Sequence, residues 1–136
     1  MERAINRDQL LLSQPAVAAT RADQQVVTDL LDTLAANSDR CVGMAANMIG
    51  VNKNVIVVRM GPVAVPMINP RLTHLHGPFT TKEGCLSLDG ERETVRYQSL
   101  DVDYLDAQWR PQHQHFSGWV AQIIQHEVDH TQGRLI

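Results

Sequence analysis

Hydrophobic and polar positions follow a helical period near both ends of the chain and a strand period between them. After Thr20 and Asp23, which stand at the spacing of a helix cap, apolar residues recur every three or four positions as far as about Asn37. This pattern predicts an amphipathic N-terminal helix with one buried and one solvated face. Residues 1–19 lack such a period, and we expect an irregular arm laid against the core.

The middle of the chain is a series of short apolar runs separated by turn residues. We expect strands over residues 54–59, 63–69, 71–76, 93–97, 99–105 and 109–116. Gly61 and Pro62 mark the first turn, and residues 106–108 predict a hairpin link between the last two strands. In the strand before that link, apolar side chains alternate with Asp101 and Asp103, so one face should be buried and the other solvated.

Four histidines fall at alternate positions in the predicted strands. His74 and His76 stand in one strand, and His113 and His115 stand in another. The sequence shows no acidic or cysteine partner near the second pair. We interpret all four as ordinary solvent-facing residues.

The second helical pattern begins after Ser117 and is apolar on several sides. Its adjoining stripes consist of Val120, Ile124 and Val128 and of Ile123, His126 and His130. Gly133 predicts the end of this helix. A helix of this kind is buried, so we expect an α+β fold in which antiparallel sheets pack around a central C-terminal helix. Residues 1–136 should form a single domain.

The composition narrows the classes of function. The chain has 136 residues, of which 43% are hydrophobic and 20% charged, which is enough apolar material for a core. Its formal net charge of -3 gives no broad attraction to nucleic acid or to an acidic membrane. No apolar run approaches the roughly 20 residues that span a bilayer, and the N-terminus leads into no signal-type apolar core. We therefore expect a cytoplasmic protein in which Cys41 and Cys85 stay reduced.

The candidate chemistry lies in the C-terminal helix, where His126 and His130 stand four residues apart. Two histidines at this spacing project from one helix face and can hold a single metal ion, and Glu127 beside them can handle a proton from metal-activated water. The pattern also occurs by chance in surface helices, so it needs a third ligand. Cys85 offers a thiol, although a lone cysteine is more often a small buried hydrophobe.

Three separate segments together resemble the signature motifs of one enzyme family. They are residues 43–50, 83–87 and 125–130, the last followed by Gly133. The first segment alone would be interpreted as a tight turn of small residues. In their order and spacing, however, the three are similar to the motifs of peptide deformylases, and the chain resembles that family over nearly its whole length.

The resemblance implies a metal-dependent hydrolase. Cys85, His126 and His130 would ligate one divalent ion, Fe2+ in the cell, with Zn2+, Ni2+ or Co2+ as substitutes. The reaction would remove the formyl group from N-formylmethionine of newly synthesised polypeptides, so the partners would be N-formylmethionyl nascent peptides, including those at the ribosome. Three protein ligands leave a fourth position open, as in catalytic sites, and a thiolate suits iron or zinc better than magnesium or calcium. Glu127 is the expected proton carrier.

The first motif departs from the family pattern at the reaction centre. Met48 stands where the family usually has a glutamine whose amide helps to stabilise the oxyanion, and a thioether cannot donate a hydrogen bond. Removing such a donor elsewhere slows turnover by about 10² to 10³. The backbone NH of Leu86, a donor that the resemblance implies, would remain, and Asn47 could substitute if the loop were rotated. Cys41, where a glycine is frequent, is interpreted as a small residue that fits, with a reactive thiol as the alternative.

The substrate pocket is predicted only in outline. An apolar pocket for a methionine side chain would be walled by Val42, Gly43 and Met44 on one side and by Ile123 on the other. Core packing explains Ile123 equally well. Extended backbone at Gly43 and Met44 and at residues 86–88 could pair with a peptide in strand fashion.

Several polar residues flank the expected ligands. Gln125 and Asp129 lie beside them on the helix, and hydrogen bonds that hold the site and simple solvation are both open interpretations. Glu83 could form an ion pair with Arg92 or Arg96 and thereby hold the cysteine loop.

Two other functions are compatible with these residues. One is a weak or divergent deformylase-fold protein acting on other N-acylated amines, which Met48 favours. The other is a non-catalytic metal-binding or ribosome-associated module, against which Glu127 argues, because a purely structural metal site has no use for a carboxylate there. A helical zinc peptidase of the His-Glu-x-x-His-x-x-Gly-x-x-His type does not fit, since Ile136 stands at the position of its third histidine.

Overall fold

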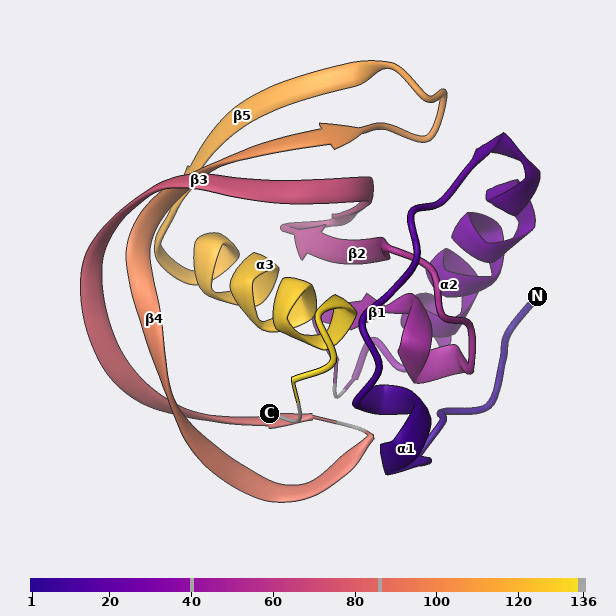
Figure 1. Cartoon of the computed structure of the whole chain (residues 1–136), viewed down its shortest axis with the longest axis horizontal. Coiled ribbons are helices and arrows are strands. Elements are labelled where there is room, and N and C mark those ends of the chain that lie inside the picture. Colours follow the sequence, from indigo (N-terminus) through magenta and orange to yellow (C-terminus); the bar gives the residue numbers. More distant parts are fainter. Residues whose placement is uncertain (40, 86, 135–136) are drawn as a thin grey trace.

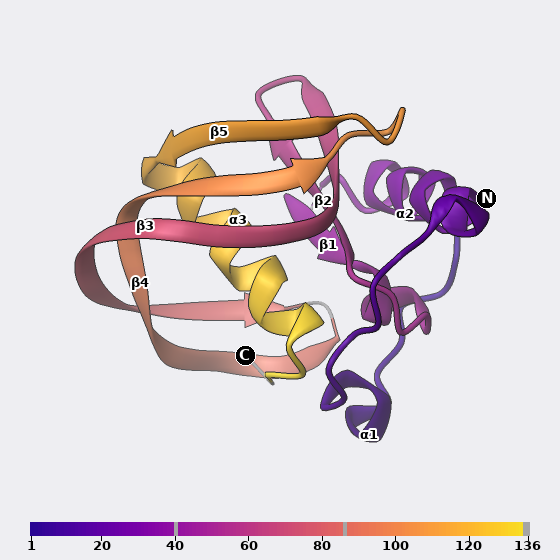
Figure 2. The ribbon, with the colours of Figure 1, turned by 45° about the horizontal axis from the view of Figure 1, so that its top comes forward.

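The C-terminal helix runs through the middle of the molecule, and the long strands bend around it (Figures 1 and 2). The computed structural model describes residues 1–39, 41–85 and 87–134. Helices α1, α2 and α3 span Gln9–Leu12, Gln24–Ala36 and Gly118–Thr131, and the 3-10 turns η1 and η2 span Arg21–Asp23 and Ala46–Ile49. Strands β1 to β5 span Gly43–Ala45, Val55–Met60, Val63–Cys85, Leu88–Leu105 and Pro111–Ser117. They form one antiparallel sheet in the order β1-β2-β3-β4-β5.

Helix α3 is buried because its apolar stripes face the inner side of the sheet. Ile124 has no exposed surface and packs in one cluster with Leu100 and Val102 of β4, which are also fully buried. Burying an aliphatic side chain of this size contributes about 1.5–3 kcal/mol. The predicted central helix is confirmed, with Ser117 at its N-cap and Gly133 just beyond its end at a φ of 80°.

A second core lies on the other side of β2, under α2. Leu30 of α2 packs with Val55 and Val57 of β2. The alternate residues Ile56 and Val58 instead join the cluster around α3. Because both faces of β2 are buried over its first four residues, that part of its sequence is an apolar run rather than an alternation.

The N-terminal part of the chain agrees with its prediction except at one point. The amphipathic helix is confirmed as α2, with Asn37 at its C-terminal cap. The arm before it contains one helical turn, α1, where a wholly irregular path was expected. Asp8 caps this turn, since its Oδ1 accepts from Leu10 N at 3.0 Å, and burial of Leu12 holds the turn against the core.

The strands predicted separately between residues 63 and 105 are two long strands, β3 and β4. Their pairing shifts between Ile68 and Arg71 and again between Thr73 and His76. Bulges of this kind bend a strand without ending it, so interruptions of the alternation resembled turns in the sequence. The sequence predicted antiparallel sheets in the plural. In the structure the long curved strands β3 and β4 join all five strands into a single antiparallel sheet.

Two further boundaries differ from the prediction. The segment 43–50, expected on its own to be a tight turn, contains β1 and η2. The hairpin link after β4 is confirmed, with Asp106 N donating to Arg110 O at 3.0 Å. However, β5 begins at Pro111 rather than at Trp109, because Trp109 lies in the link with a positive φ of 65°.

The four strand histidines are exposed as predicted, but the expectation that His113 and His115 lack acidic partners is wrong. The strand register places His113 opposite Asp103 and His115 opposite Asp101. In both pairs the histidine Nδ1 lies within hydrogen-bonding distance of the carboxylate, at 2.5 Å and 2.7 Å. The partners were hidden in the sequence because they belong to a different strand.

Within the described ranges, no helix has the length and apolar character that crossing a membrane requires.

Candidate metal centre

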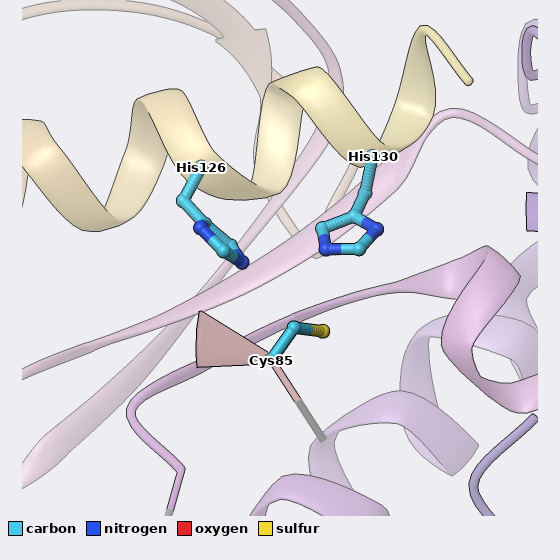
Figure 3. Close-up of side chains that lie close together, drawn as sticks. All are labelled: Cys85, His126 and His130. Carbon is cyan, nitrogen blue, oxygen red and sulfur yellow. The ribbon is translucent and has the colours of Figure 1, made fainter. Parts of the chain in front are cut away.

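Cys85, His126 and His130 come together from two elements that are distant in the sequence. Cys85 ends β3, and the two histidines lie one turn apart on α3. Figure 3 shows the two imidazole rings extending from the helix toward the cysteine. One ligand atom from each residue, a sulfur or a ring nitrogen, lies within 4.8 Å of the other two. The fold therefore brings together the three residues that the resemblance implied as ligands.

The donor chemistry of this group fits a divalent transition metal. A thiolate and two imidazoles are ligands that iron and zinc accept. His130 is fully buried, and neither of its ring nitrogens has a hydrogen-bond partner within the described part of the chain. Burial, together with the charge of His126, lowers the pKa of His130 to about 3, so its ring is neutral. Coordination of an ion would satisfy a buried nitrogen that otherwise costs about 1–3 kcal/mol.

Glu83 fixes the orientation of His126. Its Oε1 lies 2.7 Å from His126 Nδ1, and donation from Nδ1–H leaves Nε2 available to a metal ion. Burial raises the pKa of the Glu83 carboxyl, but hydrogen bonds from His126, Arg96 and Gln122 outweigh it and lower the pKa to about 2. Burial also opposes a charge on His126, yet hydrogen bonds with Cys85 and Glu83 raise its pKa to about 10. The same anionic surroundings favour a bound cation.

Arg96 connects the strand that carries the cysteine to the helix that carries the histidines. Its Nη2 donates to Glu83 Oε1 at 2.6 Å, its Nε lies 3.0 Å from Glu83 Oε2, and its Nη1 donates to Asp129 Oδ2 at 2.6 Å. The Arg96 side chain is only 3% exposed, so water does not compete for these donors. Of the two ion pairs left open for Glu83, the one with Arg96 is confirmed.

Gln125 and Asp129 hold the frame of the site rather than face solvent. The Gln125 amide exchanges two hydrogen bonds with the backbone of Tyr97, donating to its oxygen at 2.9 Å and accepting from its nitrogen at 2.8 Å. Asp129 accepts from Arg96. The framework interpretation therefore holds for both residues, and both fasten α3 to β4.

Glu127 lies in a tight space beside the expected ligands. It is 4% exposed, and burial raises the pKa of its carboxyl to about 7. A group with such a pKa can both take up and release a proton at neutral pH. Gly43 of β1 lies against it, and a Cβ at position 43 would stand 3.0 Å from Glu127 Oε2. A side chain at position 43 would therefore displace the carboxylate.

A pocket of about 860 Å³ opens onto this group. It is lined by Val42, Gly43, Met48, Ile123 and Glu127 among the residues predicted for the site, together with Cys85 and His126. Met44 contributes no side chain to this lining, since its side chain is fully buried in the core under α2. Ile123 belongs both to the lining and to the core around α3, so both interpretations hold. Leu86 lies outside the described residues.

The pocket is also lined by Arg7, Trp119 and Gln122, to which no role was assigned from the sequence. Gln122 donates to Glu83 Oε2 at 2.9 Å, and it stands one helical turn before His126, so periodicity could have indicated it. Arg7 is brought to the pocket by the N-terminal arm, where the preceding residue donates from its backbone to Met48 O at 2.6 Å. No local sequence pattern predicts this long-range contact between the arm and η2.

Asn47 does not replace the donor that Met48 lacks. Its Nδ2 donates to the backbone oxygen of His130 at 2.8 Å, and the backbone oxygen of Asn47 accepts from Asn6 Nδ2 at 3.1 Å. These bonds tie η2 to the end of α3 and to the N-terminal arm. The rotation that would present the Asn47 amide to the pocket would break them.

Cys41 and Cys85 are not joined by a disulfide. Cys41 lines the pocket and donates from Sγ to the Gly43 carbonyl at 2.8 Å. The thiol is thus accommodated as a small side chain beside the glycine of β1.

Comparison with known proteins agrees with this geometry. The family described as polypeptide deformylase matches residues 5–136. A peptide deformylase of Clostridium beijerinckii is 48% identical over 136 residues and is covered completely, as is this chain. One from Pelotomaculum thermopropionicum is 38% identical over 128 residues, covering 92% of this chain and 82% of the relative.

Solved structures give the same result. A crystal structure of the class I type b peptide deformylase from Acinetobacter baumannii aligns with a TM-score of 0.88 at 28% identity, covering 99% of this chain and 97% of that one. A peptide deformylase from Legionella pneumophila aligns with a TM-score of 0.88 at 29% identity, covering 99% and 83%. The family match over residues 5–136 and the 48% identical relative of equal extent establish that this chain belongs to the peptide deformylase family.

Proposed function

We propose that this peptide deformylase holds a divalent metal ion, Fe2+ in the cell, with Cys85, His126 and His130, and moves the proton with Glu127. The reaction hydrolyses the formamide bond of an N-formylmethionyl peptide and yields formate and a free amino group. The observation that carries the proposal is a set of three ligand atoms within 4.8 Å, beside a buried carboxylate whose pKa is about 7.

The protein residues supply binding and orientation at this centre. When bound, the ion would supply Lewis acidity, which polarises the formyl carbonyl and lowers the pKa of water from 15.7 to about 7. One thiolate with two imidazoles favours Fe2+, Zn2+, Ni2+ or Co2+ over Mg2+ or Ca2+. Glu83 keeps His126 in the tautomer that leaves Nε2 for the ion, and Arg96 keeps Glu83 in place.

Glu127 carries the proton through the reaction. Its carboxylate takes a proton from the attacking water and returns it to the amine nitrogen as the carbon–nitrogen bond breaks. A pKa of about 7 suits both steps, because neither protonation state is strongly favoured at neutral pH. The oxyanion would be stabilised by the backbone NH of Leu86, as the resemblance implies, without a second donor at Met48.

The peptide is expected to bind along β1. This strand ends the sheet order and is paired with β2 on one side, so its other edge can accept an extended peptide by strand addition. Val42, which is 40% exposed, and Ile123 would contact the methionine side chain. Met44 would take part through its backbone. The A. baumannii relative has been solved with Met-Ala-Ser bound, which supports a short peptide as the occupant of such a pocket.

The physiological substrates would be nascent N-formylmethionyl chains in the cytoplasm, met as they leave the ribosome. A net charge of -3 gives no broad attraction to ribosomal RNA, so the peptide itself would be the recognised partner. Residues 1–136 would act as one catalytic domain, because the pocket is lined from Arg7 in the arm to Glu127 in α3.

Release of formate from formyl-Met-Ala-Ser tests the proposal, using protein purified anaerobically with Fe2+ or loaded with Ni2+. Acetyl-Met-Ala-Ser is the matched substrate, because it separates deformylation from a divergent activity on other N-acylated amines. We expect turnover of the formyl peptide and much slower turnover of the acetyl peptide. No formate above background with either metal would contradict the proposal.

A further inference from the structure

Three exposed histidines converge on one aspartate, on the face of the sheet that points away from α3. Asp101 lies in β4 between two residues that are fully buried against the helix, so its side chain points outward. His115 Nδ1 lies 2.7 Å from Asp101 Oδ1. His113 Nε2 and His74 Nδ1 each lie 3.3 Å from Asp101 Oδ2. The deformylase reaction makes no use of this cluster.

The backbone explains how three strands deliver these rings to one place. His113 and His115 are two residues apart in β5 and therefore share a face. His74 would point to the opposite face in a regular β3, since its neighbour Thr73 pairs with Asp101. The pairing is irregular at this point, and His74 has a positive φ of 53°, which turns its ring toward the carboxylate.

The two contacts of Asp101 Oδ2, although not the wider spacing between the rings themselves, match the separation between ligands of one metal ion. With bonds of about 2.0–2.2 Å to nitrogen and oxygen, two tetrahedral ligand atoms stand about 3.3 Å apart. The two contacts of Asp101 Oδ2, with His113 and with His74, are both 3.3 Å. The three histidine side chains are 57% to 68% exposed, so they can rotate into a common coordination sphere without disturbing the core.

The local charge also favours a cation. Hydrogen bonds from His115 hold the pKa of Asp101 below its usual range, and those from His113 do the same for Asp103, so both carboxyls are ionised at neutral pH. Asp103 lies 2.5 Å from His113 Nδ1 and so holds the ring that bridges the two aspartates. The positively charged Arg71 pairs with Asp103 at 3.4 Å on an exposed surface, where water screens its charge.

We propose that Asp101, His74, His113 and His115 form a second site for a divalent transition metal ion, such as Zn2+, separate from the Cys85 centre. Imidazole and carboxylate ligands suit zinc, and the ion would take the place of the protons that now link the rings to the carboxylate. Because its ligands come from β3, β4 and β5, a bound ion would also cross-link three strands of the sheet.

The test is a calorimetric titration with Zn2+ at pH 7.5. The protein is the whole chain with its Cys85 centre already filled with zinc. Wild type should bind one further equivalent, and Asp101→Asn and His113→Gln should each weaken that binding at least tenfold. His76→Gln is the matched control, since His76 is exposed on the same strand two residues beyond His74, and it should bind like wild type. All variants should keep their formate release.

Histidine NMR provides the second readout. Zinc beyond the first equivalent should shift the ring signals of His74, His113 and His115 and leave those of His76 in place. Absence of a further equivalent in wild type, or equal affinity in Asp101→Asn, would overturn the proposal. Neither result would bear on the deformylase activity, because the two readouts are independent of formate release.

Discussion

A Cβ atom at Gly43 would stand 3.0 Å from Oε2 of Glu127 and 2.8 Å from Cγ2 of Ile123. Gly43 is therefore the point at which β1, proposed to bind the peptide, packs against the carboxylate proposed to carry the proton. The φ of Gly43 is not positive, so the position requires the missing side chain rather than the backbone freedom of glycine.

Gly43→Ala should lower kcat for formyl-Met-Ala-Ser by about 10- to 100-fold, because a reacting group displaced by about 1 Å can lose that much rate. Gly61→Ala is the control for lost glycine in the turn between β2 and β3: its positive φ of 64° makes alanine strained there, but a Cβ meets nothing within 4 Å and so displaces no group of the site. The control should keep its rate. An unchanged kcat in Gly43→Ala, at equal metal content, would show that the Glu127 carboxylate has more room than the contact distances indicate.

Glu83→Gln should remove part of the acid sensitivity of folding. The pKa of Glu83 is about 2 in the folded protein against an ordinary 4.5, so its carboxylate stabilises the fold fully above pH 4.5, and this stabilisation is lost as the pH falls toward 2. Between pH 7 and pH 3, wild type should lose about 2 kcal/mol more free energy of unfolding than Glu83→Gln. Urea unfolding at both pH values measures this. Glu93→Gln, at an exposed position of β4, should behave like wild type, and equal losses in all three proteins would contradict the prediction.

Met48→Gln should raise kcat, because it restores a side-chain donor at a position that lines the pocket. The gain from one oxyanion donor can reach about 10². Steady-state kinetics with formyl-Met-Ala-Ser measures it, and Met48→Leu, which adds no donor, should leave kcat near that of wild type. A rate for Met48→Gln at or below wild type would mean that the oxyanion is held by other groups.

Arg96→Lys should weaken metal retention by about 10- to 100-fold, because a lysine cannot bridge Glu83 and Asp129 as the guanidinium does. Transfer of the metal to a coloured chelator measures the dissociation rate. Arg110→Lys, which alters an exposed pair with Asp106, is the control and should retain metal like wild type. Equal retention in both variants would show that Glu83 keeps its position without Arg96.

Local periodicity was sufficient to predict α2 and α3 and the burial of α3, because those patterns repeat within a few residues; the single turn α1 is too short to show one. Periodicity failed for β3 and β4, since positive φ values of 51° at Asn69 and 53° at His74 belong to bulges that resemble turns in sequence. Local periodicity also did not predict which residues of neighbouring strands pair. The pairing of His115 with Asp101 across two strands is the clearest example.

The site divides in the same way. His126 and His130 lie on one helix, so their spacing alone predicted that they share a face. Cys85 was predicted as their partner only through the family resemblance. No local pattern indicates it, since β3 must bend around the helix before the thiol approaches the rings. The bond from Asn47 to the His130 carbonyl depends on such long-range packing, which explains why the sequence left its role open.

The most direct test of the account is formate release by Glu127→Gln, compared with wild type at equal metal content. Glutamine keeps the size of the side chain but cannot accept the proton, so the metal should remain bound while kcat falls by about 10² to 10⁴. Metal analysis and steady-state formate release at saturating substrate, on the same samples, give both values. A variant that retains its metal and turns over formyl-Met-Ala-Ser within a few-fold of wild type would contradict the assignment of Glu127 as the proton carrier.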